Sequence, residues 1–274
     1  AAAHRLADER DRAEDMHRQV MDSIVYAQRI QQAILPDPAE VERLLPGSFV
    51  VYLPRDVVSG DFYWLHQSGN STIVAVVDCT GHGVPGAFMS LIGASLLSEI
   101  VKREGLRSPA EILEALDQQI QRALRDGSDR SRLDGMDASV LRIDPQRVVF
   151  AGAFQNLFWL PEGSSEVQTV RGNRRGLGGR FRAKARSFSE TTLPRDQPMR
   201  LYLPTDGLVD QPGERDGPFD TRRLRQLLVE IHQLPAKRQA AAVRAAFQEH
   251  RGPVSQRDDV TVLGFPLAAR TSVG

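Results

Sequence analysis

The sequence contains a single cysteine, Cys79, among 274 residues, so one chain can form neither a disulfide framework nor a zinc site built from thiolates. Lysine and arginine together number 35, as do aspartate and glutamate, and the net charge at pH 7 is zero. A balanced charge gives no overall attraction to nucleic acids or to anionic membranes. No apolar run approaches the roughly 20 residues that span a bilayer, and we expect neither a membrane span nor a signal peptide within these residues.

Hydrophobic residues make up 41% of the chain, which is enough for one large core or two small ones. The sequence begins with three alanines instead of a methionine, and we expect it to be part of a longer protein. The chain itself is expected to be cytoplasmic. Any membrane attachment, as in the cytoplasmic part of an inner-membrane sensor, would come from a missing upstream region.

The first 35 residues contain neither glycine nor proline, and apolar or small residues recur there every seven positions. The repeat comprises Leu6, Ala13, Val20, Ala27 and Ile34, with Met16 and Ile30 between them and Glu9 and Ser23 as interruptions. Such a period is typical of coiled coils. It favours a homodimer paired through this helix over a helix that lies on its own domain. We therefore expect a linker and dimerisation helix, residues 1–36, and a second domain, residues 37–274.

Short strands and pairs of helices alternate after Pro36. Strands are predicted at 48–52, 62–67, 72–77, 138–143, 147–153, 157–160 and 260–265, and helices at 84–103, 108–125, 221–232 and 236–250. Hairpin turns such as Ser68-Gly69-Asn70 join neighbouring strands. This order favours an α+β fold with separate sheet and helix layers over a parallel β-α-β sheet.

Four aspartates lie in short strand-end or loop contexts, namely Asp61, Asp78, Asp206 and Asp258. Any one of them is explained as a turn or capping residue. Carboxylates that converge at one end of a sheet, however, repel one another unless a cation joins them. Oxygen ligands suit Mg²⁺ or Mn²⁺, and the number of carboxylates indicates two ions rather than one.

Three glycines after Asp78 spell the G-x-G-x-x-G pattern of dinucleotide sites, namely Gly81, Gly83 and Gly86. We disfavour a dinucleotide because the predicted helix runs into another helix instead of a second parallel strand with an acidic residue. Pro85 also removes a backbone N–H from the turn that would hold a phosphate.

Cys79 and His82 lie in the same stretch and each allow two interpretations. A cysteine phosphatase needs an arginine six positions after its nucleophile, but this chain has Pro85 there. A small, half-buried residue at a strand end is therefore the better interpretation of Cys79. His82 is either a general acid or, as we favour, a residue that braces the loop through a hydrogen bond.

A basic segment, residues 171–195, contains one acidic residue, Glu190. Its basic residues are Arg171, Arg174, Arg175, Arg180, Arg182, Lys184, Arg186 and Arg195. A solvated hairpin flap and a docking surface for an acidic or phosphorylated partner both explain this run. Only Phe181 and Phe188 are interspersed, so no nucleic-acid partner is expected.

Several segments, in this order, resemble SpoIIE/RsbU-type members of the PPM (protein phosphatase 2C-like) serine/threonine phosphatases, and among them SiaA-like sensor phosphatases. They are residues 23–36, 54–64, 78–93, 134–137, 205–207 and 258–261. The resemblance covers about residues 20–266 and implies two antiparallel sheets packed face to face between outer helices. This is an αββα four-layer sandwich with a two-metal site at one end.

Carried over to this chain, the resemblance implies a site for two Mn²⁺ or Mg²⁺ ions. Asp78 would bridge both ions, and the Cys79 main-chain carbonyl would bind one of them. Asp206 and Asp258 would complete the site of the other. Asp61 would hold the second metal directly or through water.

The resemblance also assigns supporting residues around the metals. Asp259 would join or support the ligands, and Arg55 would reach the substrate phosphate unless it is only a charge on a surface strand. The chain departs from the family at Phe154-Gln155-Asn156, where Asn or His commonly follows Ala-Gly-Ala, and at Gln197-Pro198, where Gly-Asp is common. These departures concern the rim of the site and not a ligand.

The activity implied is removal of phosphate from a phosphorylated protein partner, such as an anti-sigma-factor-antagonist-like protein, in bacterial signal transduction. A hydroxide activated by two metals would attack phosphorus in line. A pseudophosphatase scaffold that binds a partner without catalysis is the alternative, but such a protein is expected to have lost an aspartate. A metal-dependent nucleotide cyclase is a further alternative, and nothing in the sequence suggests its base-recognition residues.

Overall fold

Two antiparallel sheets lie face to face in the computed structural model, which describes residues 2–124, 134–179, 187–214 and 216–270, with side chains from residue 8 onward. Sheet A has the order β1 (Phe49–Leu53), β10 (Val260–Leu267), β9 (Met199–Pro204), β6 (Leu157–Pro161) and β7 (Gln168–Val170). Sheet B has the order β2 (Phe62–Ser68), β3 (Ser71–Cys79), β4 (Met136–Ile143), β5 (Arg147–Ala153) and β8 (Thr191–Pro194).

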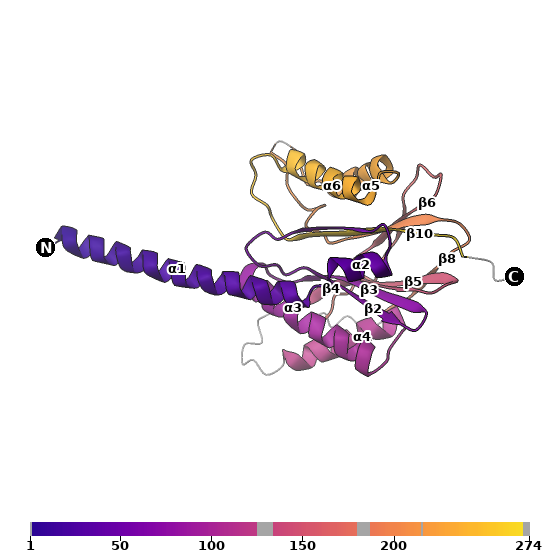
Figure 1. Ribbon diagram of the computed structural model, residues 1–274, viewed down its shortest axis with the longest axis horizontal. Coiled ribbons are helices and arrows are strands. Elements are labelled where there is room, and N and C mark those ends of the chain that lie inside the picture. The colour runs from indigo at the N-terminus through magenta and orange to yellow at the C-terminus, as the bar shows by residue number, and fades with distance from the viewer. Residues whose placement is uncertain (1, 125–133, 180–186, 215, 271–274) are drawn as a thin grey trace.

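Helices cover the outer faces of both sheets (Figure 1). Sheet A packs against α5 (Asp220–Ile231) and α6 (Ala236–Arg251), and sheet B against α3 (Gly83–Ser98) and α4 (Pro109–Ala123). In α5, Leu224, Leu227, Leu228 and Ile231 are buried, which is the spacing of an apolar helix face. The architecture is the expected αββα four-layer sandwich.

The interior strand β3 contributes side chains to both cores of the sandwich. Ile73, Ala75 and Val77 point into the core beneath the helices of sheet B. Val74 and Val76 point the other way, into the core between the two sheets. Because side chains alternate along a strand, one apolar run fills two cores at once.

Helix α3 continues into a π-helical turn, η1 (Glu99–Arg103). The expectation that no apolar segment is long enough to span a bilayer is wrong for Gly83–Arg103, which passes that test by length and composition alone, but 50% of its most apolar window is buried inside the protein. Leu97, Ile100 and Val101 pack into the core against sheet B. This agrees with the buried helix predicted there.

Three short elements form where the sequence analysis predicted neither a helix nor a strand. No element was predicted between Pro36 and residue 48, but α2 (Pro38–Leu44) forms there. Asp37 caps it by accepting a hydrogen bond from the Ala39 N–H at 2.7 Å, and Pro38 occupies the first turn, where a missing N–H costs nothing. Strands β7 and β8 form at either end of the basic segment, where the strand signal was weak.

Helix α1 (Ala2–Ile34) projects from the sandwich (Figure 1). Residues 8–20 are all exposed, and the exposed fractions of Met16, Val20 and Ile30 are 66%, 52% and 44%. Leu6 lies outside the described side chains. The outer part of α1 therefore does not lie on its own domain, and the apolar positions of the repeat there face solvent.

Candidate metal centre

Strand ends from both sheets bring aspartates to one end of the sandwich. In sheet B, the register of β3 and β4 places Asp78 opposite Asp137, and Asp61 immediately precedes β2, whose Phe62 pairs with Val77. In sheet A, β9 ends where its neighbour β10 begins. Asp206 and Asp258 therefore lie just beyond the residues that pair between these two strands. In an antiparallel sheet, one strand ends at the same end of the sheet at which its neighbour begins. Residues at these strand ends therefore lie close together.

Asp61 is the most deeply buried member of the cluster, with an exposed fraction of 1%. Its Oδ2 accepts a hydrogen bond from the Thr205 hydroxyl at 2.7 Å. Its Oδ1 is buried and has no hydrogen-bond partner. A buried carboxylate oxygen without a partner is costly unless another group binds it.

The charges of the cluster act on one another. Burial, and then the charges of Asp61 and Asp206, raises the pKa of Asp78 well above its ordinary value, and Asp78 and Asp206 are within hydrogen-bonding contact. Burial and the charges of Asp259 and Asp206 raise the pKa of Asp61 in the same way, despite the hydrogen bond from Thr205. Each ionised carboxylate of the cluster therefore disfavours the ionised form of its neighbours.

Asp137 is a member of this cluster that the sequence reasoning did not select. Burial and the charge of Asp206 raise its pKa to about 7. Its position in an Asp-Gly-Met-Asp segment matched the family pattern, but the paired register with Asp78 is what places it at the centre.

Asp259 supports the loop that carries Asp61. Its Oδ1 accepts the Arg55 N–H at 2.7 Å and its Oδ2 accepts the Gly60 N–H at 2.7 Å. Both oxygens are thus engaged with the main chain, which suits a supporting role better than that of a primary ligand. The Asp258 Oδ1 accepts the Asp259 N–H at 2.8 Å.

Two arginines flank the carboxylates. Arg55 is exposed, and its guanidinium donates to the Arg257 carbonyl at 2.9 Å. Arg257 was not selected from the sequence, but its charge lowers the pKa of Asp206 against the effect of burial. The sequence feature that could have pointed to Arg257 is its position directly before Asp258.

The three glycines of the G-x-G-x-x-G pattern shape the turn between β3 and α3. Gly81 and Gly83 have φ angles of +86° and +65°, which favour glycine. β3 pairs antiparallel with both of its neighbours, and α3 is followed by α4. The dinucleotide interpretation is therefore excluded, as expected, because it needs a parallel strand after the helix.

Cys79 ends β3, as expected, but it is fully buried, with an exposed fraction of 3%, instead of half-buried, and the surroundings of His82 agree with its expected bracing role. Burial, and then the charge of Asp78, raises the pKa of the Cys79 thiol well above its ordinary value, so the nucleophilic thiolate is disfavoured. The His82 Nδ1 lies 2.8 Å from the Asp56 Oδ2, so the histidine braces its loop against the neighbouring one.

The carboxylate cluster fits divalent cations. Among the described residues, no group of three or more His, Cys, Asp or Glu side chains is positioned so that it could hold a metal ion in this arrangement, so the fit rests on the chemistry of the donors. The donors are all oxygens, which Mg²⁺ and Mn²⁺ prefer. The unpartnered Asp61 Oδ1 and the raised pKa values of Asp61 and Asp78 are both features that a bound cation would relieve.

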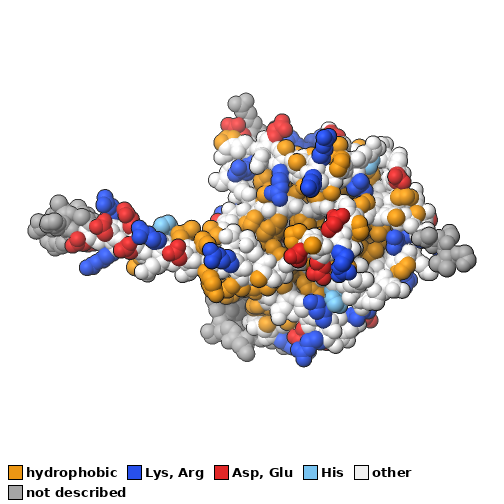
Figure 2. Space-filling model, viewed as in Figure 1, with side chains coloured by type: hydrophobic (Ala, Val, Ile, Leu, Met, Phe, Trp, Pro, Cys, Tyr) orange, Lys and Arg blue, Asp and Glu red, His pale blue; other side chains and the backbone are white. Residues whose placement is uncertain are grey.

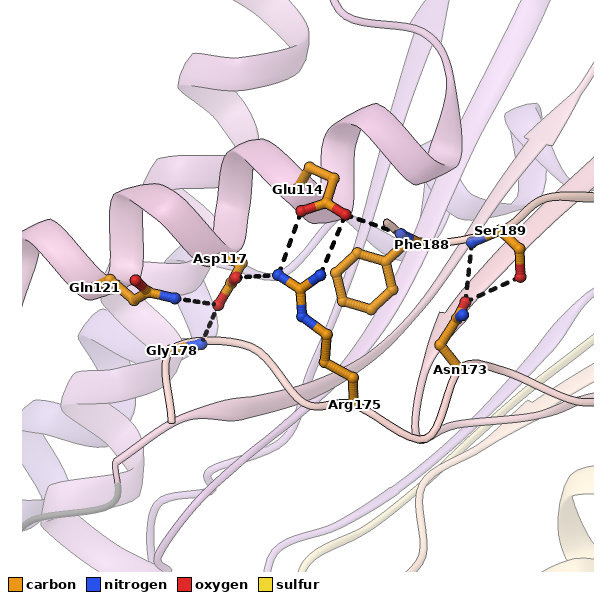
Figure 3. Close-up of polar contacts among 8 residues, drawn as sticks. All are labelled: Glu114, Asp117, Gln121, Asn173, Arg175, Gly178, Phe188 and Ser189. Carbon is orange, nitrogen blue, oxygen red and sulfur yellow. Dashed lines mark hydrogen bonds and ion pairs between the residues drawn. The ribbon is translucent and has the colours of Figure 1, made fainter. Parts of the chain in front are cut away.

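The basic segment is in part a structural element (Figure 3). The Arg175 guanidinium donates to both oxygens of Glu114, at 3.2 and 3.3 Å, and to Asp117 on α4. It also stacks on Phe188, 4.5 Å from the ring centre. Asp117 further accepts the Gly178 N–H at 2.7 Å.

The docking interpretation of the basic segment is therefore wrong for Arg175 and for Arg195. Arg195 donates to the main-chain carbonyls of Asp144 and Ala268, so it ties loops together. Arg171 and Arg174 are exposed and remain compatible with docking. Arg180, Arg182, Lys184 and Arg186, with Phe181, lie outside the described residues.

Comparison with known proteins agrees with this architecture. Residues 68–266 match the family described as stage II sporulation protein E (SpoIIE). The SiaA-PP2C domain of Pseudomonas aeruginosa is 34% identical, with a TM-score of 0.81, and the match covers 92% of this chain and 98% of that one. Among curated proteins, none matches the chain.

Two more distant structures share the fold. The PP2C domain of SpoIIE from Bacillus subtilis, solved with a fragment of its regulatory domain, is 15% identical, with a TM-score of 0.64, over 82% of this chain and 62% of that one. The RsbU and RsbW domains of a Mycobacterium tuberculosis protein are 20% identical, with a TM-score of 0.63, over 83% and 62% of the two chains. At these identities they support the fold alone.

We predict that Arg175→Met lowers the free energy of unfolding by about 2–3 kcal/mol, because two carboxylates of α4 lose their shared cation in a poorly hydrated place. Denaturant unfolding measures the change. The control Arg174→Met, at an exposed neighbour, should change stability by less than about 0.5 kcal/mol. Equal effects of the two variants would contradict the structural role of Arg175.

We predict that the cation-free protein becomes more stable as pH falls from about 8 to about 5. The folded-state pKa of Asp137, about 7, lies above that of an unfolded aspartate. Its contribution is therefore present at low pH and is lost as pH rises through about 7. Thermal unfolding in excess chelator measures this, and Asp137→Asn should flatten the dependence. If the stability of Asp137→Asn depends on pH as that of the unmodified protein does, the raised pKa of Asp137 does not cause the dependence.

Proposed function

The chain belongs to the SpoIIE family of PPM-type phosphatase domains, and we propose that it is a metal-dependent protein serine/threonine phosphatase. The observation that carries the metal dependence is the convergence of Asp61, Asp78, Asp206 and Asp258 at one end of the sandwich, with a buried and unpartnered oxygen on Asp61. None of these four aspartates is lost, which argues against a non-catalytic scaffold.

The proposed ligands are the carboxylates of these four aspartates and the main-chain carbonyl of Cys79. Bound Mn²⁺ or Mg²⁺ ions, two in number, would activate water for attack on phosphorus and offset the charge on the phosphate oxygens. Thr205 holds the orientation of Asp61 through its hydroxyl. Asp259 holds the same loop through the Gly60 and Arg55 amides.

Substrate binding is proposed at the open side of the cluster, where Arg55 and Arg257 lie. Two guanidinium groups beside a set of carboxylates suit a phosphate that contacts both the arginines and the metals. With a protonated, buried thiol at Cys79, no covalent phosphocysteine is part of the reaction. The proposed substrate is a phosphorylated protein, such as an anti-sigma-factor-antagonist-like protein, in a bacterial signalling pathway.

Helix α1 supports a proposal about assembly. Its exposed apolar positions, Met16, Val20 and Ile30, would be covered by the same helix of a second copy, which gives a homodimer. Residues 1–36 would then be the linker and residues 37–274 the phosphatase domain. We place the chain on the cytoplasmic side, as the output part of a sensor whose membrane attachment lies upstream.

We predict that hydrolysis of a phosphoserine peptide requires Mn²⁺ or Mg²⁺ and stops in excess chelator. Asp78→Ala and Asp206→Ala should each reduce turnover by more than about 100-fold, because each removes a ligand, while the fold seen by circular dichroism is kept. Phosphate release is the measurement. Near-normal turnover of either variant with metal present would defeat the proposal.

The matched control for this experiment is Cys79→Ser, which keeps the main-chain carbonyl and removes only the thiol. It should retain most of the activity. A pseudophosphatase scaffold predicts instead that the unmodified protein binds its partner and releases no phosphate with either cation.

We predict that Val20→Glu with Ile30→Glu shifts the protein toward monomer and changes its turnover, because like charges would face each other in the helix pair. Light scattering and phosphate release measure the two effects. The control Arg18→Gln with Gln32→Glu changes net charge equally at positions outside the repeat. A monomeric unmodified protein at high concentration, together with unaltered turnover of the double variant, would show that the helix is only a tether.

A further inference from the structure

Phe154 combines an unusual backbone conformation with an exposed aromatic ring. It lies between β5 and β6, its φ angle is +55°, and its exposed fraction is 42%. A positive φ is costly for a bulky residue, because its Cβ approaches a neighbouring carbonyl. Figure 2 shows hydrophobic side chains over much of one face of the body, so exposure alone marks no site. The combination of backbone strain and exposure is what points to a function.

Main-chain hydrogen bonds on both sides hold Phe154 in this conformation. Its N–H donates to the Asn173 carbonyl at 2.8 Å, and the Gln155 N–H donates to the Ala153 carbonyl at 2.7 Å. The second bond closes a three-residue turn around Phe154, which is rare and strained when the central φ is positive. Gln155 is buried, and its Nε2 donates to the Asp137 carbonyl at 3.1 Å. The turn is therefore fixed relative to the strand that carries Asp137.

The Phe154 ring and the Asp137 carboxylate lie against the same glycine, Gly176. A Cβ at that position would lie 2.9 Å from the Asp137 Oδ1 and 3.4 Å from a carbon of the Phe154 ring. Asp137 in turn pairs with Asp78 across β3 and β4. The ring is thus at the rim of the carboxylate centre, where the residues next to a bound phosphoserine would pass.

The segment that contains Gly176 also carries two exposed cations, Arg171 and Arg174. A phosphorylated peptide is an anion, so positive charge on this segment attracts it. A second copy of the chain fits this place less well, because a symmetric contact would bring the same arginines together. The occupant that both the ring and the charge favour is a phosphorylated peptide with an apolar side chain.

We propose that Phe154 is a specificity-determining residue, which packs against an apolar side chain directly next to the phosphorylated residue of the substrate. This inference rests on the proposed phosphatase function and extends it to the sequence of the substrate. The turn already fixes the main chain of Phe154, and its side chain has only two torsions. Little conformational freedom is therefore lost when a substrate packs on the ring.

The test compares two phosphoserine peptides that differ only in the residues on either side of the phosphoserine, leucine in one and glutamine in the other. The unmodified protein should have a kcat/KM about tenfold higher for the leucine peptide, which corresponds to about 1.4 kcal/mol. Phe154→Asn should reduce this ratio to about one, mainly by raising KM, because the ring touches the substrate and not the reacting atoms. Phe154→Tyr keeps a ring and should keep the ratio.

Thermal unfolding separates recognition from a structural role. Asparagine tolerates a positive φ better than phenylalanine does, so Phe154→Asn should raise the midpoint of unfolding. A ring needed for packing predicts a lower midpoint and an unchanged ratio. The matched control is Tyr26→Asn, which removes another exposed ring, 64% exposed, from α1 and should leave the ratio unchanged.

Two results would overturn the inference, namely no preference in the unmodified protein and a ratio that survives in Phe154→Asn. If the unmodified protein hydrolyses neither peptide, the proposed function fails. Fluorescence anisotropy of labelled copies of the two peptides then measures the preference as a ratio of dissociation constants. An equal ratio in Phe154→Asn and in the unmodified protein would overturn the role of the ring in that case as well.

Discussion

Repulsion among the carboxylates at one end of the sandwich is the constraint on which the rest of this protein depends. Asp61 is buried and Asp78 half-buried beside other acids, and the pKa values of both carboxyls are raised. A folded domain keeps such a cluster only if its surroundings impose the positions, because the charges alone would drive it apart. The fold therefore supplies the restraint, and under the proposed function a divalent cation would offset the repulsion.

That restraint comes from main-chain pairing and from a few polar side chains. The β3–β4 register sets Asp78 against Asp137. Thr205 links Asp61 to the end of β9, and its hydroxyl also accepts the Thr261 N–H at 2.9 Å. Residues of both sheets are thus linked directly at the site.

Elements far from the centre reach it by short chains of contacts. Leu177 pairs with Met136 through two main-chain hydrogen bonds, and Arg175 and Gly178 attach the same loop to α4. On the opposite side, Gln31 attaches α1 to the loop before Asp61. Two helices on the surface are therefore each one loop away from a carboxylate of the cluster.

The sequence alone determined the layers and the main ligand candidates, because apolar alternation, turn residues and strand-end aspartates are local patterns. Those patterns predicted an α+β fold with separate sheet and helix layers and the candidates Asp61, Asp78, Asp206 and Asp258, whereas the αββα order came from the family resemblance they carry. Only the tertiary structure brought in Asp137 by strand register, gave Arg175 to α4 instead of a docking surface, and buried Gln31 against Ser59. These depend on contacts between residues distant in sequence, which no local pattern records.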